Sequence, residues 1–368
     1  MIRQCFIWLK GGERSFREYM DKKLSKWEVE RERFVNDVID CLNKGMVPWR
    51  KEWKYNFKPQ NPITNTVYKG GNAIRLFVAS SLRGYEDDRF MTFLQAEEKG
   101  WKVKKGAKGI PIEKFMLYDK ETKKLFDSNS IKNLSFNEQL EYKNKNVYPV
   151  VKIFYVFNGQ EIEGIPPLEK EIKEVNYNKI DKILENSGVK ILYGGGEAYY
   201  SPKVDEIHLP EKRNFISEET FYSTALHELG HSTGHKDRFN RNLSGKFGSV
   251  DYSKEELIAE LSSVFSGMKL SLKFDNSILD NSKAYLQGWA KDLENNKHLL
   301  FEASKEAEKV SDHIVKLQNF HNNEIFKNFL PGEKINNLKT KENKPINSLV
   351  EKIQAQREKK ENSLGRKI

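Results

Sequence analysis

The sequence predicts an α+β protein with two domains and a basic C-terminal tail. Its 368 residues are enough for two domains of ordinary size. Helical and strand-like periodicities occur in both halves, and the pair Pro166-Pro167 marks a boundary between them. We therefore expect one domain at residues 25–165, a second at 177–315 and a tail at 321–368.

The composition indicates an intracellular protein with an anionic partner. The net charge of +10 favours nucleic acid over a neutral ligand. Cys5 and Cys41 are the two cysteines, too few for a disulfide framework, which indicates a reducing cytoplasm. No run approaches eighteen apolar residues, so we expect no membrane span and no membrane partner.

The first half is expected to begin with a helix. Apolar residues recur at helical spacing over 27–42, and Gly45 is placed where a glycine commonly ends a helix. Further helices are expected at 73–81 and 92–99, a β-branched strand at 147–157 and a variable loop at 119–146.

The stretch from Pro48 to Phe115 carries much of the surplus positive charge, with fourteen Lys/Arg against seven Asp/Glu. Such a mixture of cations and rings suits single-stranded DNA. Cations follow the phosphates, and aromatic rings stack on bases at about 1–3 kcal/mol per base. The alternative is that the tryptophans are core residues and the lysines only solvate a surface. We favour DNA binding, with candidate contacts Trp49, Arg50, Trp53, Tyr68, Lys69, Arg75, Trp101, Lys102, Lys104 and Lys105.

The second half contains an H-E-x-x-H motif at residues 227–231. Residues four apart lie on one helical face, so the imidazoles of His227 and His231 can bind one ion. Neutral imidazole suits Zn²⁺, and Glu228 can take a proton from water and pass it to a leaving amine. Ser217 is the expected N-cap. The alternative is two surface histidines on an amphipathic helix.

Two features beside the motif carry expectations about packing. Gly230 lies inside the helix, where glycine costs about 1 kcal/mol relative to alanine, so we expect a neighbouring strand to approach closely there. Residues 198–209 are expected to form a strand, and Pro202 favours an edge position. An edge strand can pair with the main chain of an extended peptide substrate.

The third metal ligand has two main candidates. Glu256 lies on a later predicted helix, in a gluzincin-like arrangement, and Glu260 one turn on would orient an imidazole. Ser253 and Glu256 also fit a capping box, which is the structural alternative for that glutamate. Asp237 competes because the spacing reads H-E-x-x-H-x-x-G-x-x-D, as in metzincins, and His235 is a looser candidate. We favour Glu256.

Two more helices are expected over 284–293 and 299–317, where apolar stripes suit packing against the catalytic helix. From His321 to the end, eleven Lys/Arg face six Asp/Glu with few apolar residues. This composition predicts a loosely ordered basic tail.

Several motifs occur in one order along the chain: Pro48-Trp-Arg-Lys-Glu-Trp, Tyr68-Lys-Gly-Gly-Asn-Ala, Gly100-Trp-Lys-Val-Lys-Lys-Gly, Val156-Phe-Asn-Gly-Gln-Glu, the H-E-x-x-H helix and Glu255-Glu-Leu-Ile-Ala-Glu. Together they resemble antirestriction proteins of the ArdC type over about residues 25–315. The resemblance implies an N-terminal domain that binds single-stranded DNA and a zincin-like metallopeptidase domain. It implies protection of incoming plasmid or phage DNA from host restriction, with a protein substrate that it does not identify. The alternative is a DNA-binding shield in which the metal is structural and proteolysis is absent.

Overall fold

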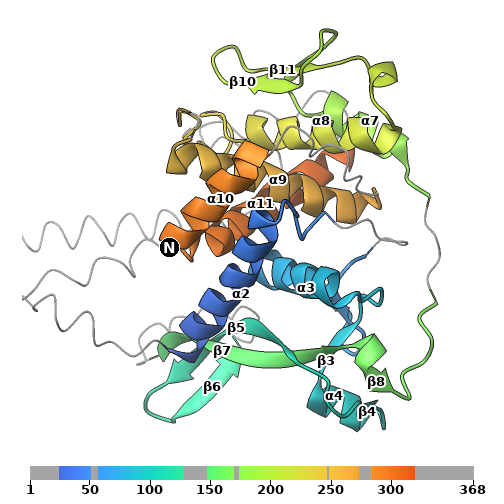
Figure 1. Cartoon of the computed structure of the whole chain (residues 1–368), viewed down its shortest axis with the longest axis vertical. Helices are drawn as coiled ribbons and strands as arrows, with labels where there is room; N and C mark the ends of the chain where they lie inside the picture. Colours follow the sequence, from blue (N-terminus) through green and yellow to red (C-terminus); the bar gives the residue numbers. More distant parts are fainter. Residues whose placement is uncertain are drawn as a thin grey trace, which may run out of the picture. The chain divides into compact units, whose positions relative to one another are not determined.

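The computed structural model describes residues 25–50, 57–127, 147–169, 174–246, 248–272 and 283–319. Within these residues the predicted α+β fold class is confirmed, since each half combines helices with a small sheet (Figure 1). The expected tail at 321–368 and the expected DNA contact Trp53 lie outside the described residues. No helix in the described part of the chain is both long and apolar enough to cross a bilayer.

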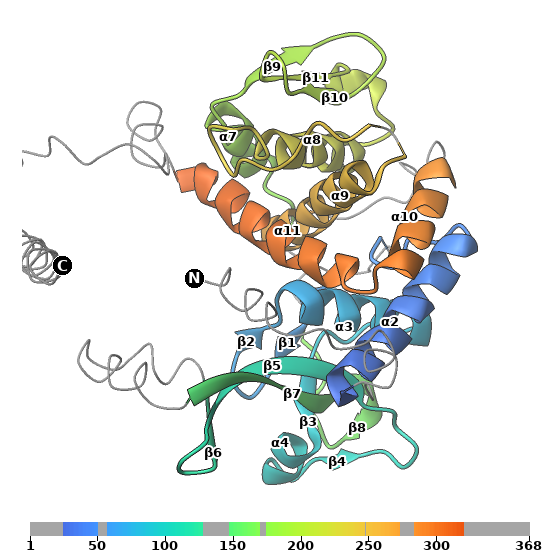
Figure 2. The ribbon, with the colours of Figure 1, turned by 90° about the vertical axis from the view of Figure 1, so that its left-hand side faces the viewer.

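The first half places two helices on one side of a four-stranded antiparallel sheet, whose strand order is β3-β7-β5-β6 (Figures 1 and 2). A short helix and a two-stranded pair of β4 with β8 lie at the other side. In chain order the elements are α2 (Lys26–Asn43), β1 (Gln60–Asn61), β2 (Thr66–Val67), α3 (Gly70–Arg83), β3 (Phe90–Thr92), α4 (Phe93–Glu98), β4 (Lys102–Val103), β5 (Ile110–Asp119), β6 (Lys124–Asp127), β7 (Val147–Asn158) and β8 (Ile162–Glu163).

The expected first helix is confirmed as α2, and Gly45 after it has a φ of +77°, which glycine adopts without strain. The expected helix at 92–99 begins one residue later. Thr92 is its N-cap and accepts a hydrogen bond from the Gln95 amide, while the residues before it pair with β7. The loop expected at 119–146 contains strand β6, which pairs antiparallel with β5.

The second half packs a three-stranded sheet over helix α8, with further helices beneath (Figure 2). Strand β11 lies between its parallel neighbour β9 and its antiparallel neighbour β10. The elements are α7 (Tyr177–Glu185), β9 (Lys190–Tyr193), β10 (Tyr199–Ser201), β11 (Glu206–Leu209), α8 (Glu218–Ser232), α9 (Val250–Leu270), α10 (Lys283–Asn295) and α11 (Leu299–Lys316).

The single strand expected at 198–209 is a hairpin instead. Residues 202–205 form the turn between β10 and β11, and Asp205 occupies the left-handed region with a φ of +54°. Pro202 therefore lies in a turn rather than within a strand, because proline supplies no amide for a ladder. Strand β10 is nevertheless at the edge of the three-stranded sheet, so an edge is present beside α8 as expected.

Helix α8 carries the H-E-x-x-H motif and is buried along most of its length. The Ser217 hydroxyl accepts from the Thr220 amide at 3.1 Å, which confirms the predicted N-cap. Gly230 faces helix α9 rather than a strand. A Cβ added there would lie 2.5 Å from Ser262 Oγ and 3.2 Å from Ala259 Cα. The close approach of two helices is thus the reason for a glycine at this position.

Helix α9 begins earlier than the sequence indicated. Its N-cap is Ser249, whose hydroxyl accepts from the Tyr252 amide at 3.3 Å. Ser253 is therefore inside the helix, and a capping box between Ser253 and Glu256 is excluded. Glu256 is free to serve another purpose, one helical turn before Glu260 on the same face.

Most buried apolar residues of both halves form one continuous cluster, from Phe34 on α2 to Leu317 after α11, and Met91, Ala96 and Ile162 form a small separate one. Helix α11 packs against both α9 and α3, and α10 packs against α2 (Figure 2). Because the core is shared across the helices of both halves, side chains of the first half can reach Glu260 on α9.

Candidate metal centre and DNA-binding surface

Three predicted metal ligands converge between α8 and α9. One donor atom each of His227, His231 and Glu256 lies within 4.8 Å of the other two. The two Nε2 atoms are 3.1 Å apart, and Glu256 Oε2 is 3.6 Å from each of them. Among the described residues this is the group of His, Cys, Asp and Glu side chains that could hold a metal ion.

The donor set fits a divalent cation. Two ligands at about 2.0–2.1 Å from a tetrahedral Zn²⁺ are about 3.3 Å apart, close to the observed spacing of the two imidazoles. Two imidazoles and one carboxylate suit Zn²⁺ and also Mn²⁺, since both metals accept nitrogen and oxygen donors. His227, His231 and Glu256 would hold the ion.

A second carboxylate lies near the other ring nitrogen of each histidine. Glu260 Oε2 lies 3.7 Å from His227 Nδ1, and Glu255 Oε1 lies 3.3 Å from His231 Nδ1. Glu260, the residue expected to orient an imidazole, therefore lies beside His227, although Nδ1 of that ring makes no hydrogen bond in this structure. Glu255 lies within hydrogen-bond distance of the second histidine, a contact that the sequence did not indicate.

The two outer carboxylates are both held by arginines. Arg241 donates to Glu255 Oε1 and Oε2 at 2.7 and 2.8 Å. Arg50 donates from Nε and Nη2 to the two oxygens of Glu260. The arginines thus compensate for the burial of two carboxylates, which would otherwise be costly.

The neighbouring carboxylates raise the pKa of both imidazoles. Burial opposes a charged imidazole at His227, but the carboxylates of Glu256 and Glu260 outweigh it and raise its pKa to about 9. At His231 the carboxylates of Glu255 and Glu256 likewise outweigh burial and raise the pKa to about 10. The pKa of Glu256 is lowered by both histidines despite burial. A cation can replace these protons, so metal binding releases them.

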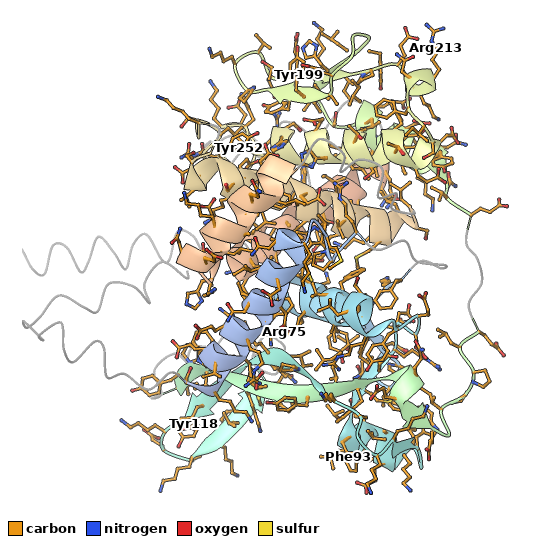
Figure 3. The ribbon with its side chains drawn as sticks, viewed as in Figure 1. Arg75, Phe93, Tyr118, Tyr199, Arg213 and Tyr252 are labelled. Carbon is orange, nitrogen blue, oxygen red and sulfur yellow. The ribbon has the colours of Figure 1, made fainter. Side chains whose placement is uncertain are left out.

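A cavity of about 360 Å³ opens onto the three ligands. Glu228, which is 7 % exposed, lines this cavity together with the ligands. Tyr199 of β10 and Tyr252 of α9, both labelled in Figure 3, also line it, so the edge strand and the metal group border one cavity. Nothing in the sequence pattern marked Tyr252 as a cavity residue.

The other ligand candidates lie elsewhere. The side chain of Asp237 is 61 % exposed, and its carboxylate is 3.4 Å from His235 Nδ1. His235 in turn lies 4.0 Å from Asp205, in the turn of the hairpin. Neither residue joins the group formed by the H-E-x-x-H histidines in the described structure. The polar loop after α8 thus contacts the β10–β11 turn through His235 and Asp205.

Three candidate DNA contacts are buried and unavailable to a DNA strand in this structure. Trp49 is 1 % exposed and donates from Nε1 to Glu260. Arg50 is paired with the same carboxylate. Arg75 lies inside the first half, where it donates to the Pro111 carbonyl at 2.9 Å (Figure 3). Trp49 is therefore a core residue in this structure, as the alternative interpretation of the tryptophans predicts.

Three other candidates are partly buried or lie near an acidic side chain. Tyr68 is half-buried, and its hydroxyl donates to the Phe90 carbonyl at 3.1 Å. Lys69 is exposed but lies 3.5 Å from the carboxylate of Asp312. Trp101 packs on a small apolar cluster around Ile162.

Lysine side chains dominate the surface at β4 and the turn that follows it. Lys102, Lys104 and Lys105 are all exposed, and Lys104 Nζ donates to the Gln160 carbonyl at 2.8 Å. Phe93, at the start of neighbouring α4, is 49 % exposed (Figure 3). Its ring is accessible in a way that the ring of Trp49 is not, and the sequence reading missed it because a lone phenylalanine carries no signal of exposure.

Both halves match known families. Residues 28–157 match the N-terminal domain of the anti-restriction factor ArdC. Residues 178–306 match a family of zincin-like metallopeptidases, MPTase-PolyVal.

The chain is also similar to curated proteins. It is 37 % identical over 313 residues to the DNA primase TraC of Escherichia coli, an alignment that covers 81 % of this chain and 20 % of the primase. The chain thus spans about a fifth of that relative's length. It is 26 % identical to the uncharacterized protein y4eC of Sinorhizobium fredii, with 76 % of this chain and 90 % of that protein aligned.

Solved structures of the antirestriction protein ArdC from plasmid R388 match the fold. The metal-free structure has a TM-score of 0.61 and 29 % sequence identity, and covers 79 % of this chain and 98 % of that chain. The Mn(II)-bound structure has a TM-score of 0.62 at the same identity, with 79 % and 99 % covered. The chain therefore has an ArdC N-terminal domain followed by a zincin-like metallopeptidase domain, and its fold is similar to that of ArdC from plasmid R388.

Proposed function

We propose that this protein binds single-stranded DNA through its first half and cleaves a protein with its second half, in a Zn²⁺-dependent reaction. The two activities would together protect incoming plasmid or phage DNA from restriction in a bacterial host. The observation that carries the peptidase proposal is the convergence of His227, His231 and Glu256 on a cavity that Glu228 also lines. A site that only braced the fold would need ligands but no such base.

A bound divalent cation would supply a Lewis acid that polarises a peptide carbonyl and acidifies water. Glu228 would act as general base, taking a proton from the attacking water and passing it to the leaving amine. Strand β10 would offer its free main-chain edge to an extended segment of substrate, because that edge is unpaired among the described strands. Tyr199 would then lie beside the bound segment.

The DNA-binding proposal draws on the ArdC N-terminal domain and on exposed side chains. Lys102, Lys104 and Lys105 supply cations at one surface, and Phe93 supplies a ring for base stacking nearby. The similarity to TraC primases supports an association with conjugation and mobile elements. We place the DNA-binding domain at 25–165 and the peptidase domain at 177–315.

Comparison of Glu228→Gln with the parent tests the peptidase proposal. This change removes the base but keeps the size of the side chain, so bound metal and single-stranded DNA affinity should stay at the parent values. We expect protection of DNA entering a restricting host to fall. Full protection by a variant that retains metal would instead favour a DNA-binding shield in which proteolysis has no part.

A further inference from the structure

The carboxylate of Glu260 is held by two residues from the first half of the chain. Arg50 donates from Nε to Oε1 and from Nη2 to Oε2, and Trp49 donates from Nε1 to Oε1 at 3.3 Å. The side chains of Arg50 and Glu260 are 6 % and 3 % exposed. Arg50 and Glu260 are 210 positions apart, so this pair joins the DNA-binding half to the metal centre.

We infer that Arg50 is a positioning residue of the metal centre: by holding Glu260, it fixes the orientation of the His227 ring and thereby raises the affinity of the site for metal. The inference rests on the proposed metal site and assigns part of its construction to the first half. Arg50 touches neither the ligand atoms nor the space where substrate would lie.

The hydrogen bonds to Glu260 restrict the orientation of its carboxylate. A guanidinium binds a carboxylate through two parallel hydrogen bonds, which a single ammonium group cannot reproduce. Trp49 adds a third donor on the same carboxylate. The oxygen that Arg50 Nη2 binds, Oε2, is also the one that faces His227 Nδ1 at 3.7 Å.

The Glu260 carboxylate lies within ion-pair distance of His227 Nδ1, which has no hydrogen-bond partner in this structure, so a carboxylate fixed there favours a proton on that nitrogen. If Nδ1 carries the proton and points it at Glu260, the lone pair of Nε2 is directed at the ion. In this structure Nε2 of His227 already lies 3.1 Å from Nε2 of His231. Without Arg50 the buried Glu260 carboxylate would lack its counter-charge and would keep only the Trp49 hydrogen bond from the first half.

The second histidine has the same arrangement from a local source. Arg241 holds Glu255, and Glu255 lies 3.3 Å from His231 Nδ1. Arg241 and Glu255 are 14 positions apart, in the loop and helix that follow α8. Among the described residues, the carboxylate beside the first histidine is held from the distant half of the molecule, and the one beside the second histidine is held from a nearby loop.

The test compares Arg50→Met and Arg50→Lys with the parent in the full chain. Zn²⁺ and Co²⁺ affinity would be measured by competition with a chromophoric chelator, well below the unfolding temperature. The d–d absorption of bound Co²⁺ reports ligand geometry. Loss of an outer hydrogen-bond partner typically costs about 10–100-fold in metal affinity, so we expect that loss in Arg50→Met together with a changed spectrum. Arg50→Lys keeps the charge and should recover part of the affinity.

Lys297→Met is the matched control. Lys297 Nζ donates to Asn36 Oδ1 at 2.7 Å, a contact between the two halves that lies on exposed side chains. This variant loses a cation that links the halves but leaves Glu260 untouched, so its metal affinity and Co²⁺ spectrum should equal those of the parent.

Parent-like affinity and spectrum in folded Arg50→Met would overturn the inference and leave the metal site standing. If the Arg50–Glu260 pair only stabilised the fold, Arg50→Met would keep the parent metal affinity and Co²⁺ spectrum but would have a lower melting temperature. Should Arg50→Met fail to fold, Arg50→Lys decides on the same two measurements, because an unchanged affinity and spectrum there would also overturn the inference. A parent protein that binds neither ion would overturn the metal site itself.

Discussion

Two regions of the molecule, the metal-ligand group and the lysine surface at β4, place their charged residues in opposite ways. In the second half, imidazoles and carboxylates are buried together and hold one another in a group around His227 and His231. In the first half, Lys102, Lys104 and Lys105 remain exposed, while Trp49 is sealed in the core. A metal site therefore requires convergence in the interior, whereas a DNA-binding surface requires accessibility, and a sequence reports the first far better than the second.

The largest expected effect concerns the buried group. His227→Ala removes one of three ligands, so we expect metal affinity to fall by more than the 10–100-fold typical of an outer partner, until no metal survives dialysis. Elemental analysis of the purified protein would measure this. Glu256→Gln should behave in the same way, whereas Asp237→Asn should keep its metal because that carboxylate is exposed and distant from the group. If only Asp237→Asn lost its metal, the third ligand would be Asp237 and not Glu256.

The difference in predictability has a physical cause. The ligands His227 and His231 lie one helical turn apart, so local geometry places them together once a helix is assumed. The prediction of Glu256 as a ligand needed only one further assumption, a second helix on the same side of the cavity. Arg50 could not be found this way, because its position beside Glu260 depends on how the shared core of both halves packs.

The fold shows the same contrast between local and distant causes. The helices α2, α8 and α11 were predictable from apolar periodicity and capping residues. Gly230 was recognised as a close approach, but the approaching element is helix α9, which periodicity within α8 cannot reveal. The hairpin at 198–209 was read as one strand because Pro202 and the left-handed Asp205 carry weaker turn signals than an Asn-Gly pair.

Trp49→Ala gives the next largest effect. Truncation of a buried tryptophan typically costs about 3–5 kcal/mol of unfolding free energy, and here it also removes a donor to Glu260. Urea unfolding followed by circular dichroism would measure the loss. Phe93→Ala is the comparison, because substitution of a half-exposed residue usually changes stability by no more than about 0.5 kcal/mol. A Trp49→Ala protein of parent stability with weaker DNA binding would contradict the burial of that ring.

Charge reversal at Lys102, Lys104 and Lys105 tests the exposed surface. If the three lysines contact phosphates, their loss should reduce the slope of log affinity against log salt by about 2 for single-stranded DNA, at about 0.7 per contact. Fluorescence anisotropy with a labelled oligonucleotide at several salt concentrations would measure the slope. Bound metal should be unchanged, because these side chains are remote from the ligand group. An unaltered slope would place the DNA path on another surface.

The smallest effect is expected for Phe93→Ala, and it separates stacking from plain electrostatic attraction. One base stacked on one ring contributes about 1–3 kcal/mol, so affinity for single-stranded DNA should fall while the salt slope stays at the parent value. Duplex affinity should not change, because paired bases offer no face to the ring. The same anisotropy assay with single-stranded and duplex oligonucleotides measures both. Equal losses for the two forms would mean that Phe93 supports the surface without stacking. No loss for either would leave the lysines as the whole of the DNA contact at this surface.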